Sequence, residues 1–203
     1  MYKRQTRIYY INFMLTNALA RYGEDINGSE NTIYGNLSEI KHALGEGYFL
    51  RAYQYFNRLK TFGDFPIITE PLPDDMATLT EASKRAPRNM VARFILEDLD
   101  KAALLMSETN YSSQYINRDL ALLFKSRVAL YEATWLKYFK GTAFVPGGEG
   151  WPGASYNPDF SYPSGSIDEE IKFFFQQAMA AAKEVGDKYV GNLTAVSYTH
   201  LRA

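Results

Sequence analysis

Residues 46–68 read EGYFLRAYQYFNRLKTFGDFPII and combine an arginine with a dense set of aromatic residues. At the helical repeat of 3.6 residues, Phe49, Tyr53 and Phe56 fall on one face of a single helix. Ala52 lies beside them and is small enough to let a neighbouring helix approach closely. The spacing therefore predicts a helix whose aromatic face packs into a protein core.

The same stretch continues into a turn and contains an arginine that also needs a role. Gly63 permits a backbone reversal, and the Asp64 carboxylate can cap it. Arg51, and Arg127 further along the chain, are expected to be partly buried and to donate to carbonyl groups at loop junctions, because a guanidinium offers five fixed donors. This reading assigns the motif mainly to the scaffold of the protein.

The remainder of the chain predicts four more helices and no convincing strand. Apolar residues at three- and four-residue spacing indicate a helix over residues 6–22, and the aromatic stretch belongs to a second over 37–61. Three more begin near Pro87, near Asn117 and at about Asp168, separated by loops rich in Gly and Pro. The fold class is predicted to be all-α.

A faint internal repeat refines this prediction. Superposing the second helix on the fourth, at an offset of 127 − 51 = 76 residues, aligns Arg51 with Arg127 and Tyr55 with Tyr131. Tetratricopeptide repeats are stacked helical hairpins in which each unit covers its neighbour's apolar face. The pattern favours tetratricopeptide-like hairpins, an α-α superhelix with long inserted loops.

Composition excludes several classes of function. The chain has no Cys and two His, which argues against thiol catalysis, disulfides and zinc centres, so neither a metal site nor a cofactor is predicted. The 22 basic and 23 acidic residues give a net charge of −1, which provides no polycationic surface for nucleic acid. Neighbouring acids such as Glu24 and Asp25 are better explained as solvated charge than as a hydrolytic pair, so no enzyme is predicted.

One stretch partly matches a calcium loop. Asp25, Asn27 and Ser29 occupy its first, third and fifth positions. Glu30 replaces the glycine of the sixth position, and Asn36 replaces the bidentate glutamate of the twelfth. These departures disfavour calcium binding.

Three segments in order resemble the SusD/RagB family of outer-membrane glycan-binding lipoproteins. They read EGYFLRAYQYFNRLKTFGDFPIITEPL, PRNMVARFILEDLDKAALLM and INRDLALLFKSRVALYEATWLKY, and together they cover about residues 46 to 138. The residues that match the family pattern are Phe49, Leu50, Arg51, Ala52, Tyr53, Tyr55, Phe56, Phe62, Gly63, Asp64, Pro66, Asp98, Leu99, Ala102, Ala121, Ser126, Arg127, Val128, Leu130 and Tyr131.

The resemblance implies a function. A member of this family would bind oligosaccharide or polysaccharide without catalysis at the outer-membrane surface of a Gram-negative bacterium, held there by a lipid anchor. It would deliver the glycan to a TonB-dependent transporter of the SusC type. The alternative that the helical pattern alone leaves open is a tetratricopeptide-like protein–protein interaction module.

Two loops combine aromatic and polar residues in the way that sugar recognition requires. Sugar C–H faces stack on aromatic rings, while amide and carboxylate groups bond to hydroxyls. Trp151 has two readings, as a ligand platform or as an anchor that fixes its loop to the body of the protein. The candidate ligand-binding residues are Asp25, Asn27 and Tyr34 in the first loop, and Trp151, Tyr156, Asn157 and Tyr162 in the second.

The two ends of the chain resemble adapter-derived sequence. Residues 1–5 (MYKRQ) and 197–203 (SYTHLRA) agree poorly with the segments beside them. We therefore expect residues 6–196 to be a fragment of a single SusD-like helical domain, in which neither a signal peptide nor a lipidated Cys is present. An incomplete helical array leaves uncovered the apolar face that its next unit would bury, so marginal stability or aggregation is expected.

Overall fold

The computed structural model describes residues 2–107 and 115–190, and within these ranges the chain is helical with no strand, which confirms the all-α prediction. An isolated bridge between Phe65 and Ala86 is the one β-like feature of the described residues. The helices are α1 (Tyr2–Tyr22), α2 (Leu37–Phe62), α3 (Met76–Ala82), α4 (Arg88–Leu105), α5 (Arg118–Tyr138), the 3-10 helix η1 (Pro152–Ser155) and α6 (Ile167–Tyr189).

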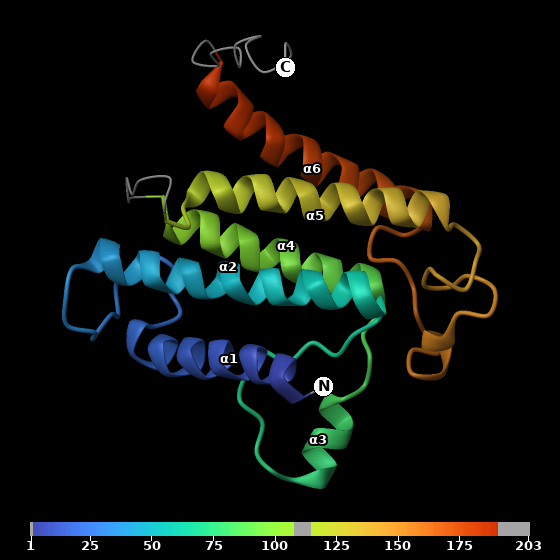
Figure 1. Cartoon of the computed structure of the whole chain (residues 1–203), viewed down its shortest axis with the longest axis horizontal. Coiled ribbons are helices and arrows are strands. Elements are labelled where there is room, and N and C mark those ends of the chain that lie inside the picture. The colour runs from blue at the N-terminus through green and yellow to red at the C-terminus, as the bar shows by residue number, and fades with distance from the viewer. Residues whose placement is uncertain (1, 108–114, 191–203) are drawn as a thin grey trace, which may run out of the picture.

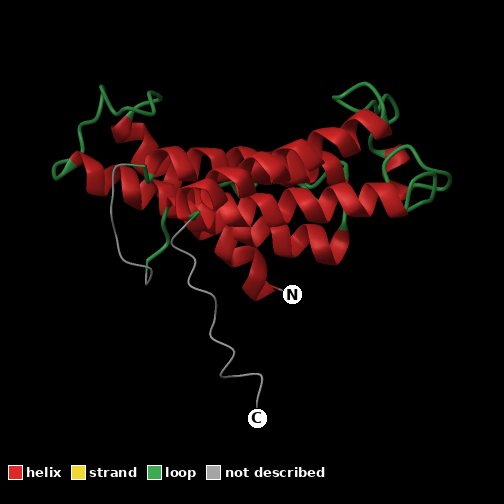
Figure 2. Cartoon of the chain, turned by 90° about the horizontal axis from the view of Figure 1, so that it is seen from above, coloured by secondary structure: helices red, strands yellow, loops and turns green. Residues whose placement is uncertain are grey.

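The long helices form a series of hairpins. Among the long helices, α2 runs antiparallel to α1, α4 to α2, α5 to α4 and α6 to α5, and each packs against the one before it. The C-terminal end of α6 diverges from α5 (Figure 1). The connecting loops collect at the two ends of this array (Figure 2). Because α2 has 26 residues, those ends are about 39 Å apart along its axis.

Local capping explains where the predicted helices start and stop. The Asn36 side chain accepts from the Ser38 amide at 2.9 Å at the start of α2, and Asn117 accepts from Leu120 in the same way at α5. Gly63 ends α2 with a φ of 70°, a left-handed conformation that glycine adopts without steric cost. These boundaries agree with the sequence-based ones.

Two elements differ from the predictions. Helix α1 begins at Tyr2 rather than at residue 6. Helix α3 was not predicted, although Asp75 caps it by accepting from the Thr78 amide at 2.8 Å. The sequence contains the Asp-x-x-Thr pattern that marks an N-cap, but the three prolines before it predict an extended stretch.

The core confirms most of the predicted aromatic face of α2, with one correction. Phe49 and Phe56 are buried, and Tyr55 is fully buried. Tyr53, predicted to be core, is 45% exposed, and its ring is tilted by 37° against Phe124 of α5 with the ring centroids 5.7 Å apart. The buried arc of α2 includes Tyr55, because its ring contacts Phe94 of α4 at 4.9 Å and its hydroxyl bonds to Ile68.

Glycine permits the close approach of α1 and α4 to α2. A Cβ at Gly47 would lie 2.4 Å from Met14 Cε on α1, and a Cβ at Gly45 would lie 2.7 Å from Met106 Cγ beside α4. Both glycines occupy a helix interior, where they cost about 0.5–1 kcal/mol relative to alanine. Tight packing on two sides is the physical reason for their presence.

Buried arginine–carboxylate pairs join α4 to three neighbouring helices. Each is bidentate, with both carboxylate oxygens accepting from one guanidinium at 2.7–2.9 Å. Such pairs fix relative helix positions because their geometry is strict. The pairs are Arg51–Asp98 to α2, Arg88–Glu132 to α5 and Arg93–Glu170 to α6.

The second predicted buried arginine is not buried. Arg127 is exposed on α5, whereas Arg51, its partner in the proposed repeat, is 5% exposed. Arg51 donates to the Thr69 carbonyl at 3.3 Å, as predicted, and its main partner is Asp98. The two helices pack on different neighbours, so residues aligned by the repeat occupy different environments.

Candidate functional site

The two loops predicted to bind ligand lie at opposite ends of the helical array. Residues 23–36 connect α1 to the start of α2, and residues 139–166 connect the end of α5 to α6 (Figures 1 and 2). The predicted residues therefore form two groups separated by about the length of α2, some 39 Å. A single site cannot use both groups within this part of the chain.

In the 23–36 loop, polar groups are largely occupied with one another. The Asp25 carboxylate accepts from the Asn27 amide at 3.0 Å and from the Ser29 hydroxyl at 2.8 Å, and these bonds hold the pKa of Asp25 below its usual value. Tyr34, by contrast, is fully exposed. The described residues contain no group of three His, Cys, Asp or Glu arranged to hold a metal ion.

Trp151 lies in the 139–166 loop and is enclosed. Its side chain is buried at 7% exposure, its ring packs on Phe160 at 5.3 Å, and its Nε1 donates to Asp64 Oδ2 at 2.8 Å. A buried ring with its polar edge satisfied has the properties of a loop anchor. Of the two readings from the sequence, the structure thus agrees with the anchor.

Asp64 joins this loop to the start of α4. Its Oδ1 accepts from the Arg88 amide at 2.9 Å, which satisfies one of the unpaired amides of the first helical turn. Burial raises the pKa of Asp64, although the hydrogen bond from Trp151 and that from Arg88 oppose the increase. Gly153 is needed here, since a Cβ at this position would lie 2.2 Å from the Trp151 ring and 2.5 Å from Asp64 Oδ2.

Other predicted residues of the same loop also hold it in shape. Asn157 donates to the carbonyls of Arg85 and Gly153, both at 3.1 Å. Tyr162 donates to the Pro146 carbonyl at 2.5 Å, and burial raises the pKa of its hydroxyl. Tyr156 is different, because 58% of it is exposed.

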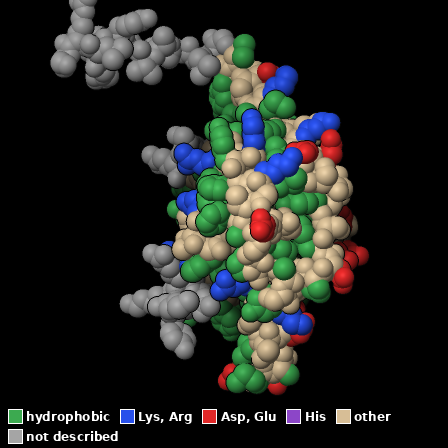
Figure 3. All heavy atoms as spheres, turned by 90° about the vertical axis from the view of Figure 1, so that its right-hand side faces the viewer, with side chains coloured by type: hydrophobic (Ala, Val, Ile, Leu, Met, Phe, Trp, Pro, Cys, Tyr) green, Lys and Arg blue, Asp and Glu red, His purple; other side chains and the backbone are tan. Residues whose placement is uncertain are grey.

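A shallow hollow of about 650 Å³, here called the loop hollow, opens beside these residues. Asn157, Asp159 and Phe160 contribute one side of it, and Pro87 and Met90 at the start of α4 contribute another. Figure 3 faces this end of the molecule, where hydrophobic side chains are interspersed with polar and charged ones. The sequence did not identify Met90 as a site residue, because a helical pattern does not show that the 139–166 loop folds back onto the start of α4.

A second hollow, here called the α1–α3 hollow, has a volume of about 510 Å³ and lies between α1, the C-terminal half of α2, residues 65–72 and α3. None of the predicted ligand-binding residues lines it. The last residues of the aromatic stretch 46–68 line this hollow, although the sequence pattern assigns them to the scaffold. Its side chains include Tyr9, Arg58, Phe62, Phe65, Glu70 and Arg85.

A third hollow, of about 700 Å³, lies beside the 23–36 loop. It is lined by Glu24 and Glu30 from the loop, Tyr48 from α2 and Lys101 from α4.

The described helices include none that is long and apolar enough to cross a membrane.

Known proteins resemble this chain in sequence and in fold. The chain is 23% identical over 176 residues to SusD-like protein P2 of Formosa agariphila, an alignment that covers 84% of this chain and 33% of that protein. The solved structure of BT4246 matches with a TM-score of 0.52 at 22% identity, covering 88% of this chain and 29% of that one, which shows a shared fold. A SusD-like protein (BF3747) of Bacteroides fragilis matches with a TM-score of 0.43 and 25% identity over 64% of this chain and 28% of that one.

A family model also matches the chain. The chain spans about a third of the length of the curated relative, 33% of it. Residues 5–130, more than half of the chain, match the SusD-like family model described as starch-binding and associating with the outer membrane. The chain belongs to the SusD-like family.

Proposed function

We propose that this chain is the helical part of a protein that binds oligosaccharide on the surface of the outer membrane. The proposal rests on membership of the SusD-like family and on the structure of the 139–166 loop. This loop is anchored to the body of the protein by Trp151 and Asp64. It contributes Asn157, Asp159 and Phe160 to the loop hollow, and it exposes Tyr156 next to Asn157 in the chain. Binding residues on a loop that a rigid scaffold positions are the common arrangement in proteins.

The chemistry of the loop hollow suits a sugar. Tyr156 offers an exposed ring on which the C–H face of a pyranose can stack, and Asp159 offers an exposed acceptor for hydroxyls. Asn157 and Asp159 line the hollow, and Tyr156 directly precedes Asn157 in the chain. Because the loop is held by internal hydrogen bonds, binding requires little ordering of the protein, which favours affinity.

We also propose that binding is non-catalytic. Glycoside hydrolysis needs two carboxyl groups facing each other across the sugar. Among the described residues, the three most buried carboxylates that face partners, Asp98, Glu132 and Glu170, each hold an arginine in a bidentate pair. Because each of these carboxylates is bound to an arginine, its role is to stabilise the helical array.

The family description supports a location for the whole protein, and the transporter partner is our proposal. It names the outer membrane, and we propose that the protein is held there by a lipid anchor and passes glycan to a SusC-type TonB-dependent transporter. Co-purification of the full-length protein with such a transporter from solubilised outer membranes is the expected result. Recovery of the protein without a transporter, under conditions that preserve transporter complexes, would count against this partner.

Calorimetric titration with maltoheptaose, a starch oligosaccharide, tests the sugar site. We expect Tyr156→Ala to weaken binding about five- to tenfold, since stacking on an aromatic ring contributes on the order of 1 kcal/mol. Tyr10→Ala is the matched control, because Tyr10 is similarly exposed, at 63%, but lies on α1 away from this loop. Equal affinity in both variants would contradict a sugar site that includes Tyr156 of the 139–166 loop.

The same titration examines the other predicted loop. Tyr34→Ala removes the fully exposed ring of residues 23–36. Sensitivity at Tyr34 with none at Tyr156 would move the sugar site to the opposite end of the helical array. Titrations with a panel of other neutral oligosaccharides extend the test to glycans other than starch.

A protein–protein interaction module is the second candidate, and one observation favours it. Tyr9, Tyr10 and Phe13 expose 47–63% of their surfaces along the outer side of α1. Exposed aromatic groups of this density are typical of interaction surfaces. If peptide binding rather than sugar binding is the function, substitutions on this side of α1 will abolish it while Tyr156→Ala has no effect.

A further inference from the structure

The α1–α3 hollow has the properties of a small-molecule site that is independent of the proposed sugar site. Its volume of about 510 Å³ lies within the usual range for ligand pockets, and its lining is mostly apolar with a few polar groups. We propose that it binds a small ring-shaped anion, a six-membered ring with one apolar face and a carboxylate.

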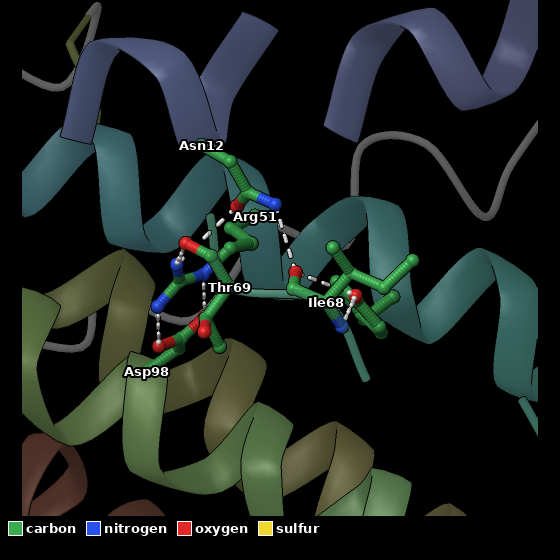
Figure 4. A network of polar contacts seen from close by, with 6 residues as sticks. Asn12, Arg51, Ile68, Thr69 and Asp98 are labelled. Carbon is green, nitrogen blue, oxygen red and sulfur yellow. Dashed lines mark hydrogen bonds and ion pairs between the residues drawn. The ribbon is translucent and has the colours of Figure 1, made fainter. Parts of the chain in front are cut away.

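The wall of this hollow is held in place before any ligand binds. Residues 65–72 have no regular secondary structure, yet the Tyr55 hydroxyl accepts from the Ile68 amide at 2.8 Å and donates to the Ile68 carbonyl at 3.0 Å. Asn12 of α1 also donates to that carbonyl, at 2.8 Å (Figure 4). Two helices therefore fix the same peptide unit.

Further bonds fix the wall on either side of Ile68. Arg51, itself paired with Asp98, donates to the Thr69 carbonyl at 3.3 Å (Figure 4). Phe65 exchanges backbone hydrogen bonds of 3.1 and 3.2 Å with Ala86. A preformed wall reduces the entropy cost of binding.

Aromatic groups at the mouth of the hollow provide the surface for a ring. Tyr9 on α1 and Phe62 at the end of α2 are 47% and 44% exposed, so both have surface that a ligand can cover. Phe62 stacks on Phe65 with ring centroids 6.0 Å apart and an interplanar angle of 21°. Because burying aromatic surface is favourable, a ligand with a flat apolar face gains from this position.

Charge selects an anion. Among the described lining residues, Arg58 and Arg85 are cations and Glu70 is the single carboxylate. Arg58 is 7% exposed, and its guanidinium lies 6.0 Å from the centroid of the Phe65 ring, so it adds positive charge to the wall of the hollow. A guanidinium pairs with a carboxylate through short, charge-assisted hydrogen bonds. Arg85 and Glu70 are exposed. Arg85 raises the positive electrostatic potential in the hollow and Glu70 lowers it.

Saturation-transfer NMR and calorimetry on the 203-residue chain test the proposal with defined probes. Glucuronate represents a sugar acid and phenylacetate an aromatic acid, while glucose and benzyl alcohol are their neutral counterparts. We expect at least one acid to bind about tenfold more tightly than its neutral counterpart, since a charge-assisted pair is the difference between them.

Two variants of exposed residues should change this affinity in opposite directions. Arg85→Gln should weaken binding of the acid about fivefold, and Glu70→Gln should strengthen it by a similar factor, because each removes one charge beside the hollow. Neither residue is buried, so the fold should be kept in both variants. Arg127→Gln is the matched control, an exposed arginine on α5 that should leave affinity unchanged.

The outcomes distinguish two classes of ligand, aromatic acids and acidic sugars. Binding of phenylacetate alone supports an aromatic acid, and binding of glucuronate alone supports an acidic sugar. Absence of binding by both acids at millimolar concentration, or equal binding of acid and neutral ring, overturns the proposal. Because Tyr156→Ala should leave acid binding unchanged and Arg85→Gln should leave maltoheptaose binding unchanged, failure of this site is distinguishable from failure of the proposed function.

Discussion

Trp151 Nε1 donates a 2.8 Å hydrogen bond to Asp64 Oδ2 across 87 residues of sequence. Asp64 belongs to the turn that follows the aromatic helix α2, and Trp151 belongs to the long loop between α5 and α6. The same carboxylate caps α4 through the Arg88 amide. One aspartate thus sets the position of the candidate sugar-binding loop relative to the helices.

Removing this hydrogen bond should destabilise the protein. Trp151→Phe keeps a ring in the buried position and leaves one lone-pair site of Asp64 without its donor. We expect a loss of about 1–3 kcal/mol in the free energy of unfolding, the usual cost of an unsatisfied buried acceptor. Urea denaturation followed by circular dichroism measures this loss.

Trp135→Phe is the control for that measurement. Trp135 Nε1 donates to the Phe144 carbonyl at 3.1 Å in an exposed setting, where water can replace the donor. Trp135→Phe should therefore lower the free energy of unfolding by less, about 0.5–1.5 kcal/mol. A larger loss at Trp135 than at Trp151 would show that the Asp64 bond does not anchor the loop.

Separating Arg51 from Asp98 should be among the most destabilising changes available. Both side chains are buried, at 5% and 1% exposure, so Arg51→Met leaves a charge without its partner inside the protein. We expect this variant to lose about 3–5 kcal/mol and the double variant Arg51→Met/Asp98→Leu to recover part of the loss. A double-mutant cycle from urea denaturation measures the coupling, and additive single losses would contradict it.

Glu170 should make stability depend on pH in the acid range. Burial opposes its ionisation, but hydrogen bonds from Arg93, Asn89 and Ser164 outweigh burial and hold its pKa below the usual value of 4.5. The ionised form is therefore favoured by folding. This contribution to stability is complete above pH 4.5 and is lost as pH falls through the folded-state pKa.

Glu170→Gln tests this dependence. The variant should be less stable than the native chain at pH 6 and should lose less stability between pH 6 and pH 3, as measured by urea denaturation at each pH. Glu169→Gln is the matched control, since Glu169 is exposed on the same turn and should leave the pH profile unchanged. Identical profiles for the native chain and Glu170→Gln would refute the linkage.

The outer side of α1 should limit solubility. Tyr10 and Phe13 are 63% and 52% exposed beside Tyr9, which forms ring contacts with both. We expect Tyr10→Lys/Phe13→Glu to reduce self-association in sedimentation velocity with little change in unfolding free energy, because exposed positions contribute within about 0.5 kcal/mol. Tyr138→Lys, at a 78% exposed site at the end of α5, is the control. A native chain that is monomeric at high concentration would contradict the expectation.

Helix positions were readable from the sequence because their signals are local. Asn36, Gly63 and Asn117 cap helices through atoms a few residues away, so the predicted boundaries hold. Orientation was harder to predict. Tyr53 satisfies the helical pattern of a buried face, and Arg127 aligns with Arg51 in the faint repeat. The exposure of both depends on which helices pack beside them, which sequence patterns do not encode.

The candidate site was predicted only in part. Composition identified the 139–166 loop as a place for Trp and Tyr, and Tyr156 is exposed there. It did not reveal that Trp151 is enclosed, since Asp64, the partner that encloses it, lies 87 residues away. The α1–α3 hollow was also missed, because it forms between segments whose sequence patterns indicate packing when read singly.

Helical class, helix ends and family follow from the order of residues, because capping, periodicity and motif spacing are properties of neighbouring positions. The pairing of Arg51 with Asp98, the enclosure of Trp151 and the separation of the two loops by the length of α2 exist only in the folded chain. Buried polar groups must find partners wherever packing places them. Those partners are chosen by contact in space, at sequence separations of 47 and 87 residues.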